Sequence, residues 1–405
     1  MDFNDTPDEA AYRATAHAWL KANAPEKGWY AGIADQNEKL AVARDWQKRK
    51  FEAGFSCITW PTEIGGQGGS PLHQVIYNQE EGEYEVPRGF FDVTFGMCLP
   101  TVIAVGGEDL KKRFVAPAQR GEEIWCQLFS EPSAGSDLAG LRTRAVREGD
   151  EWVINGQKVW TSGAHVADWG LLLTRTDPDK PKHKGMTMFW IDMRAPGVEV
   201  RPIKQMSGAS FFNEVYFDNL RIPDSQRLGA VDDGWRVSLV TLMNERASIG
   251  GMAKMEYRDT IKPLLAMLDE DGRPLVEDRA FREKLAQWYI ASEGVRLTGF
   301  RTITAMSRGE TPGPESSIGK VVTANNAQAL AREMLDLEGA FGLLTDPALS
   351  PAAAQFQQMI LHAPGSRVAG GTDEILLNII AERVLGLPGE IRVDKDVPFR
   401  DIPAG

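Results

Sequence analysis

Apolar residues recur at helical spacing in the first third of the chain. One helical face after Pro7 is formed by Ala11, Tyr12, Ala16, Trp19 and Leu20. The same period predicts helices at residues 40–51, 71–84 and 108–118. Four glycines and Pro61 interrupt it, so residues 60–69 are expected to form a loop. The first 122 residues are therefore predicted to be helical.

From about residue 124 to residue 223 the apolar period shortens toward two, as in strands. Residues 142–147 and 151–154 are predicted strands joined by a turn at Glu148-Gly149-Asp150. Asn155-Gly156 is typical of a type I′ hairpin, which would start a third strand at 157–161. Later strands are predicted at 170–174, 186–192, 198–203 and 214–217. Because no long helix separates the first two of these, the sheet is expected to be antiparallel.

After residue 233 the helical period returns. Helices are predicted at 235–249, 252–268, 278–306, 316–337, 352–361 and 372–385. The polar tail after Pro388 is expected to be an arm rather than a core element. The whole pattern predicts an α+β fold with an N-terminal helical domain (1–122), a middle antiparallel β domain (123–231) and a C-terminal helical bundle with its tail (232–405).

Composition narrows the classes of function. A chain of 405 residues is long enough for two or three domains, and a net charge of -12 argues against nucleic acid as a partner. Its apolar runs are much shorter than the ~20 residues of a membrane span. The N-terminus resembles neither a secretory signal nor a transit peptide, and the three cysteines are scattered, so we expect a cytoplasmic protein. Neither the cysteines nor the five histidines have ligand spacing, so no metal is expected.

Two short motifs stand inside the predicted β domain. The first, SEPSAGSD at residues 130–137, is a loop of small side chains whose amide groups can approach a ligand. The second, NGQKVWTS, covers residues 155–162. Together they resemble the acyl-CoA dehydrogenase motifs S/T-E-P-x-A-G-S-D and N-G-x-K-x-W-x-[ST], which have the same spacing. The resemblance extends from about residue 60 to residue 388.

The resemblance implies FAD bound between the β domain and the C-terminal helices. Trp160 would stack on the flavin ring, and the Ser162 hydroxyl would lie beside its N5 edge. Further residues that match the family's flavin contacts are Phe129, Ser130, Gly135, Ser136, Thr372 and Glu374. Taken alone, a strand tryptophan is more often a core residue, and Thr372 is sufficiently explained as a helix N-cap. Gln127 stands where many relatives carry an aromatic residue.

Dehydrogenation of a thioester requires a general base for the α-proton, and a buried glutamate suits this role. The family places this glutamate at one of two positions. The first corresponds here to Gly370, which has no side chain; the second lies in an x-E-R helix segment and corresponds to Glu245. The resemblance therefore assigns Glu245 as the base, although a lone helical glutamate is more often solvated. It also assigns Ser136, Arg246 and Gly370 to the substrate, with an amide near Gly370 polarising the thioester carbonyl.

Two segments depart from the family pattern. Many relatives bind the FAD pyrophosphate of the neighbouring subunit through R-x-[TQ]-F-G, but residues 268–275 read LDEDGRPL and lack the aligned arginine. The family's Q-x-x-G-G-x-G corresponds to DLEGAFG at 336–342, with Asp336 and Ala340 as replacements. Similar losses occur in relatives that act on sterol side-chain thioesters as heteromers.

The sequence therefore predicts an FAD-dependent acyl-CoA dehydrogenase that forms a trans-2-enoyl-CoA in fatty acid or lipid catabolism. The resemblance implies an electron-transfer flavoprotein as electron acceptor and a homodimer or homotetramer. Three alternatives stay open: a flavin monooxygenase on the same fold, a subunit of a heteromeric sterol side-chain acyl-CoA dehydrogenase, and a flavin-poor structural subunit of a heteromer. The monooxygenase would not need a buried base.

Overall fold

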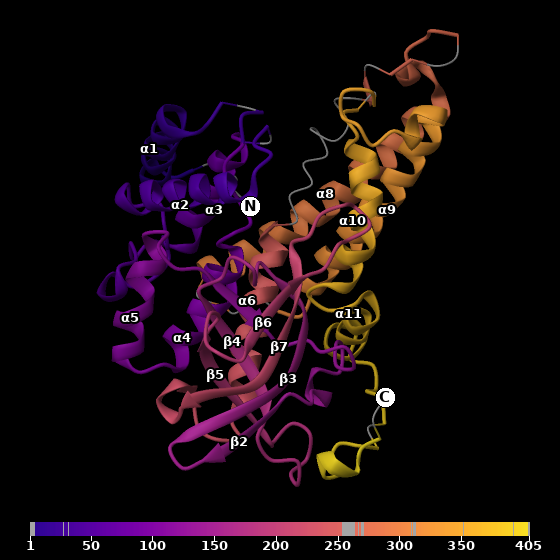
Figure 1. The fold of residues 1–405 in the computed structure, drawn as a ribbon. Helices are drawn as coiled ribbons and strands as arrows, with labels where there is room; N and C mark the ends of the chain where they lie inside the picture. Colours follow the sequence, from indigo (N-terminus) through magenta and orange to yellow (C-terminus); the bar gives the residue numbers. More distant parts are fainter. Residues whose placement is uncertain are drawn as a thin grey trace. The chain divides into compact units, whose positions relative to one another are not determined.

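The computed structural model describes residues 5–26, 28–30, 32–252, 264–265, 267–268, 271–308, 310, 313–350, 352–391 and 393–403 (Figure 1). The chain divides into two compact units. Unit 1 contains Met1–Lys204, Ser210–Glu245 and Arg392–Gly405, and unit 2 contains Gln205–Ala209 and Arg246–Ile391. The expected three-domain boundaries at residues 122 and 231 stay a prediction.

The N-terminal helices begin where the sequence provides caps. Thr6 and Glu9 form a capping box at the start of α1 (Pro7–Asn23), and Asp35 caps α2 (Gln36–Glu52). The helices α3 (Pro71–Gly82) and α5 (Glu108–Gln119) also agree with the prediction. The sequence reading missed a π-helical turn at Thr94–Cys98 and α4 (Leu99–Val105), because Gly96 and Pro100 interrupt the helical pattern. Pro100 is tolerated since it lies in the first turn of α4.

An eight-stranded sheet forms the middle of unit 1. Its strands are β1 (Trp125–Leu128), β2 (Arg144–Glu148), β3 (Glu151–Ser162), β4 (Trp169–Arg175), β5 (Met186–Asp192), β6 (Val198–Pro202), β7 (Phe212–Pro223) and β8 (Arg227–Leu228). Their order is β6-β7-β3-β2-β4-β5-β8, with β1 beside β4. Most pairs are antiparallel as predicted, but β1 is parallel to β4, and β2 meets β4 in parallel at Arg144 and Arg175. The four residues of β1 are too few to show a period.

The predicted hairpin at Asn155-Gly156 is wrong. Strand β3 continues through both residues, and the register with β7 shifts between Ile154 and Gly156. A Cβ atom on Gly156 would lie 2.5 Å from the Thr143 hydroxyl. This glycine therefore allows β3 to approach the residue before β2 closely, and it does not form a turn. Asn155 instead accepts a hydrogen bond from the Asn219 amide at 2.9 Å. The neighbouring turn at Gly149 is confirmed, because Glu148 pairs with Glu151.

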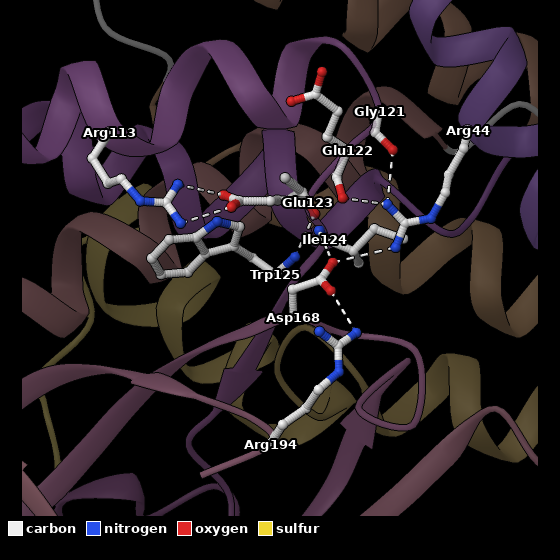
Figure 2. A network of polar contacts seen from close by, with 10 residues as sticks. Arg44, Arg113, Gly121, Glu122, Glu123, Ile124, Trp125, Asp168 and Arg194 are labelled. Carbon is white, nitrogen blue, oxygen red and sulfur yellow. Dashed lines mark hydrogen bonds and ion pairs between the residues drawn. The ribbon is translucent and has the colours of Figure 1, made fainter.

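Asp168 joins the N-terminal helices to the sheet within unit 1. Its carboxylate accepts hydrogen bonds from Arg44 of α2 at 3.2 Å, from Arg194 at 2.7 Å and from the Ile124 amide at 2.9 Å (Figure 2). Arg44 also donates to the carbonyl of Gly121. Hydrogen bonds to a charged group are stronger than neutral ones, and this carboxylate is largely shielded from water. The network fixes the chain where α5 leads into β1.

The C-terminal tail docks on unit 1, which contradicts the expectation that it is an arm. Phe399 is 5% exposed, and its amide donates to the Lys180 carbonyl at 2.9 Å. The amide of Arg400 donates to the Pro178 carbonyl at the same distance. The polar composition concealed this docking, since a single buried aromatic ring anchors the segment.

Helices dominate the second part of the chain, as predicted. They are α6 (Gly234–Met252), α8 (Arg279–Ser307), α9 (Ser316–Glu338), α10 (Gln355–Val368) and α11 (Asp373–Ile379), the last continuing into a π-helical turn, Ile380–Val384. The helix predicted at 252–268 lies mostly outside the described residues. In unit 2, α8, α9 and α10 share an apolar core that includes Phe281, Leu330, Met334 and Phe356. No helix in the described ranges is long and apolar enough to cross a membrane.

Candidate active site

A buried ion pair holds the start of the SEPSAGSD loop. The ammonium of Lys158 lies 2.7 Å from the carboxylate of Glu131, and their side chains are 0% and 5% exposed. Glu131 also accepts hydrogen bonds from the amides of Arg142 at 2.6 Å and Thr143 at 2.9 Å. Lys158 donates a further bond to the Phe129 carbonyl at 2.9 Å. The charges therefore have the partners that make burial of an ion pair tolerable.

The electrostatic balance at Glu131 favours its ionised form. Burial works to raise its pKa, but the charge of Lys158 and the hydrogen bonds from Lys158, Thr143 and Arg142 outweigh burial. The net pKa of Glu131 lies below its ordinary value of 4.5. A lowered acid pKa contributes stability above the unfolded-state pKa and loses that contribution as the pH falls. The stabilisation from ionised Glu131 should therefore be present at neutral pH and be lost as the pH falls below 4.5 and through the lowered pKa of Glu131.

Trp160 is the exposed residue of a strand that is otherwise largely buried near its end. Its side chain is 58% exposed, whereas Val159 and Thr161 are 8% and 1% exposed. The register between β3 and β7 shifts from Lys158 to Thr161, and Trp160 has φ 59°. A left-handed conformation costs an L-residue about 1–2 kcal/mol. The bulge thus turns the indole outward at an energetic cost, which is a feature of functional sites.

The far side of this bulge is fixed by Asn213. Its side-chain amide donates to the carbonyls of Thr161 at 2.9 Å and Phe211 at 3.1 Å, and the residue is 0% exposed. Phe212 packs edge-on against Trp160 with ring centroids 6.0 Å apart. Ser162, half-buried, follows directly. The sequence reading missed Asn213, although an asparagine within an apolar strand pattern is itself a signal, because strands are depleted in asparagine.

The SEPSAGSD loop is open to solvent over its second half. Gly135 and Ser136 are exposed, and within the described part of the chain their amides donate no hydrogen bond. The loop begins next to Trp160, because the Val159 amide donates to the Ser130 carbonyl at 2.9 Å. The Phe129 ring, by contrast, is 5% exposed in the apolar cluster below. Ser130, Gly135, Ser136, Trp160 and Ser162 thus lie on connected segments of unit 1.

Glu245 lies on the inner side of α6. Thr241, one turn earlier, is buried and hydrogen-bonded to the Thr101 hydroxyl of α4 at 2.9 Å. Glu245 itself is half-buried. Burial raises the pKa of the Cys98 thiol well above its ordinary value, and the negative charges of Cys126 and Glu245 add to this increase. The side chain of Arg246 lies outside the described residues.

Unit 2 holds the other predicted site residues on one turn. Gly370 and Gly371 have φ 67° and 99°, values that favour glycine, and Thr372 caps α11 by accepting from the Ile375 amide. Lys320 donates to the Gly371 carbonyl at 2.7 Å and lies 3.6 Å from the buried carboxylate of Asp373. Glu374 is exposed. The sequence analysis missed both Lys320 and Asp373, although Asp373 lies between the predicted site residues Thr372 and Glu374.

The exposed indole of Trp160 and the polar groups of the SEPSAGSD loop fit a flavin. An exposed flat indole suits a planar ring, and exposed amides beside half-buried hydroxyls suit the carbonyl and nitrogen atoms of its edge.

The comparisons with known proteins agree with this fit. Family models described as acyl-CoA dehydrogenase N-terminal, middle and C-terminal domain match residues 6–122, 126–220 and 232–385. The chain belongs to the acyl-CoA dehydrogenase family. The predicted family, fold class and enzyme class are therefore confirmed.

Two similar relatives come from Mycobacterium tuberculosis. The chain is 38% identical over 359 residues to acyl-CoA dehydrogenase FadE34 of Mycobacterium tuberculosis, covering 88% of this chain and 47% of that protein, about half its length. It is 34% identical over 391 residues to acyl-CoA dehydrogenase IpdE1 of the same species, covering 95% and 99%.

Two solved structures are similar over most of the chain. One is named Tcur3481-Tcur3483 steroid ACAD, with TM-score 0.79, 28% identity and coverage of 96% of this chain and 100% of that one. The other is the ChsE4-ChsE5 complex of Mycobacterium tuberculosis, with TM-score 0.78, 27% identity and the same coverage. Acyl-CoA dehydrogenases are flavoproteins, so this family membership agrees with the FAD expected from the sequence.

Lys158→Met should destabilise the protein strongly, because it leaves Glu131 buried without its cation. Removing one partner of a buried ion pair typically costs about 3–5 kcal/mol. Urea denaturation measures the loss. The matched control is Arg221→Ala, which breaks exposed ion pairs with Glu148 and Glu151 and should cost less than about 1 kcal/mol. Equal losses for the two variants would contradict the structural role of Lys158.

Proposed function

We propose that this chain catalyses FAD-dependent α,β-dehydrogenation of an acyl-CoA thioester to the trans-2-enoyl-CoA, with Glu245 as the general base. The observation that carries the proposal is the place of Glu245 on the inner face of α6, one turn after the buried and anchored Thr241, in a chain whose alternative base position is Gly370. We further propose that an electron-transfer flavoprotein takes the electrons, in the cytoplasm.

Each proposed site residue has a role that its chemistry allows. FAD, when bound, supplies the acceptor for the hydride that leaves the β-carbon. Trp160 provides a stacking surface, and the amides of Gly135 and Ser136 provide donors. The Glu245 carboxylate accepts the α-proton. Glu245 is half-buried, so its carboxylate is partly shielded from water.

The turn at Gly370 would bind the thioester carbonyl. In the described residues the Gly370 amide donates to no acceptor, so it is available to a substrate oxygen. Lys320 holds the turn through the carbonyls of Arg367 and Gly371. Negative charge develops on the carbonyl oxygen as the α-proton leaves, and a fixed amide donor stabilises that charge without reorganising.

Trp160→Ala should weaken FAD binding by about 3- to 10-fold, the usual worth of an aromatic stacking contact. Because the side chain is 58% exposed, the fold should survive. Fluorescence titration of the apoprotein with FAD measures the affinity. Trp29→Ala, at another half-exposed tryptophan, is the matched control and should leave FAD affinity unchanged. An unchanged affinity in the Trp160 variant would remove this residue from the flavin site.

Glu245→Gln should keep FAD and bind acyl-CoA but lose flavin reduction by on the order of 10²–10⁴-fold, because the amide cannot accept the α-proton. Anaerobic bleaching of the flavin after substrate addition measures the rate. Glu283→Gln, at an exposed position of α8, is the matched control. Reduction at the wild-type rate in the Glu245 variant would exclude this base. Oxygen consumption coupled to substrate hydroxylation would instead favour the monooxygenase.

A second candidate function concerns the partner and the substrate. We propose that the chain is one subunit of a heteromer that dehydrogenates a bulky sterol-derived thioester. The supporting observation is the segment that lacks the family arginine, where Arg273 is paired with Asp271 at 2.5 Å on the surface. Asp269 and Glu270 of this segment lie outside the described residues. The similar structures named as a steroid ACAD and as the ChsE4-ChsE5 complex also favour this assembly.

Purified alone, the chain should contain well under one FAD per subunit, because identical partners would bring acids rather than arginine to the pyrophosphate. Co-expression with a second, different acyl-CoA dehydrogenase chain from the same genome should give a heteromer with more FAD. Light scattering and the ratio of flavin to protein absorbance measure both. A homodimer or homotetramer that retains one FAD per chain would refute the heteromer and favour the simpler assembly.

A further inference from the structure

The SEPSAGSD loop is held at both ends, but by different means. Its start is fixed by the buried Glu131–Lys158 pair inside the sheet. Its end, at Asp137 and the short 3-10 turn Leu138–Gly140, is fixed by two cations that arrive from β4 and from the segment that follows β4. Arg175 donates to the Ala139 carbonyl at 2.6 Å, and Lys182 donates to both oxygens of Asp137 at 3.0 and 3.1 Å.

The C-terminal tail covers the guanidinium of Arg175. Arg175 is 3% exposed, and its Cζ atom lies 3.8 Å from the centroid of the Phe399 ring. Burial lowers the pKa of Arg175 to about 10, so it stays a cation at neutral pH. Its buried Nε has no hydrogen-bond partner among the described residues. A desolvated guanidinium gains more from an aromatic face than an exposed one, and the Phe399 ring supplies that face.

Lys182 is shared between the loop and the tail. Its ammonium lies 2.6 Å from Asp394 and 3.0 Å from Asp137, and its side chain is 10% exposed. Lys182 also offers its carbonyl to Arg175 at 2.8 Å, so the two cations form one cluster. The tail is itself held on this segment by the amides of Phe399 and Arg400. Each cation thus touches the loop on one side and the tail on the other.

We propose that the C-terminal tail, residues 393–403, positions the end of the SEPSAGSD loop. Phe399 acts through Arg175, and Asp394 acts through Lys182. With the tail in place, the exposed amides of Gly135 and Ser136 keep one orientation. The consequence for flavin binding rests on the proposed function, whereas the positioning itself does not.

Phe399→Leu keeps an apolar side chain at this site but removes the aromatic face. It should raise hydrogen exchange at the hydrogen-bonded amides within residues 130–140, those of Glu131, Ala134 and Gly140, by about 3- to 30-fold, the range of a cation–aromatic contact. Phe399→Tyr, which keeps the ring, should restore protection. Asp394→Asn, at a partly exposed side chain, should raise exchange in the same residues by a smaller factor.

The control is Arg400→Ala, at another residue of the tail. It breaks an exposed ion pair with Asp179 and should leave hydrogen exchange in the loop unchanged. Unchanged exchange at 130–140 in both Phe399→Leu and Asp394→Asn would overturn the proposal. A uniform rise over the whole chain would also overturn it, since it would show a general loss of stability. FAD titration is the separate readout: faster exchange with unchanged FAD affinity would support the positioning and overturn the role of the loop in flavin binding.

Discussion

The buried contact between Lys158 and Glu131 is the constraint on which the candidate site depends. Two charges removed from water are tolerated only with several further hydrogen bonds, and here the amides of Arg142 and Thr143 and the carbonyl of Phe129 supply them. The same bonds fix both the start of the loop and the last part of β3. One interaction therefore sets the relative position of the loop amides and the indole of Trp160.

The strain at Trp160 follows from this arrangement. Lys158 must point inward to reach Glu131, and Thr161 is buried with its carbonyl bonded to Asn213, so Trp160 between them is turned outward. A regular strand would alternate and would not bury Lys158, Val159 and Thr161 together. The bulge that resolves the conflict leaves an aromatic ring in water with a left-handed backbone. The ladder between β3 and β7 and the buried ion pair both hold this part of β3.

The end of the loop is held in a different way. Arg175 and Lys182 are buried cations, and the chain's own C-terminal tail contacts both of them. The carboxylates that Lys182 binds, Asp137 and Asp394, are partly exposed, and ionic contacts with exposed groups are weaker and more sensitive to salt than fully buried ones. The loop thus combines a rigid start with an end that responds to the tail. This difference suits a ligand-binding segment, which must be ordered while its amides stay accessible to the ligand.

Periodicity alone predicted most helices and strands, because long segments with one buried face carry many apolar positions. The motifs were sufficient for the family, and they made Trp160 and Glu245 the candidate site residues. The sequence did not reveal the parallel pairing of β1, the continuity of β3 through Asn155 and Gly156, or the docked Phe399. It also did not distinguish the structural members of the motifs, Glu131 and Lys158, from the exposed ones. Pairing partners, bulges and the burial of a charge depend on residues distant in sequence, and only the folded chain brings them together.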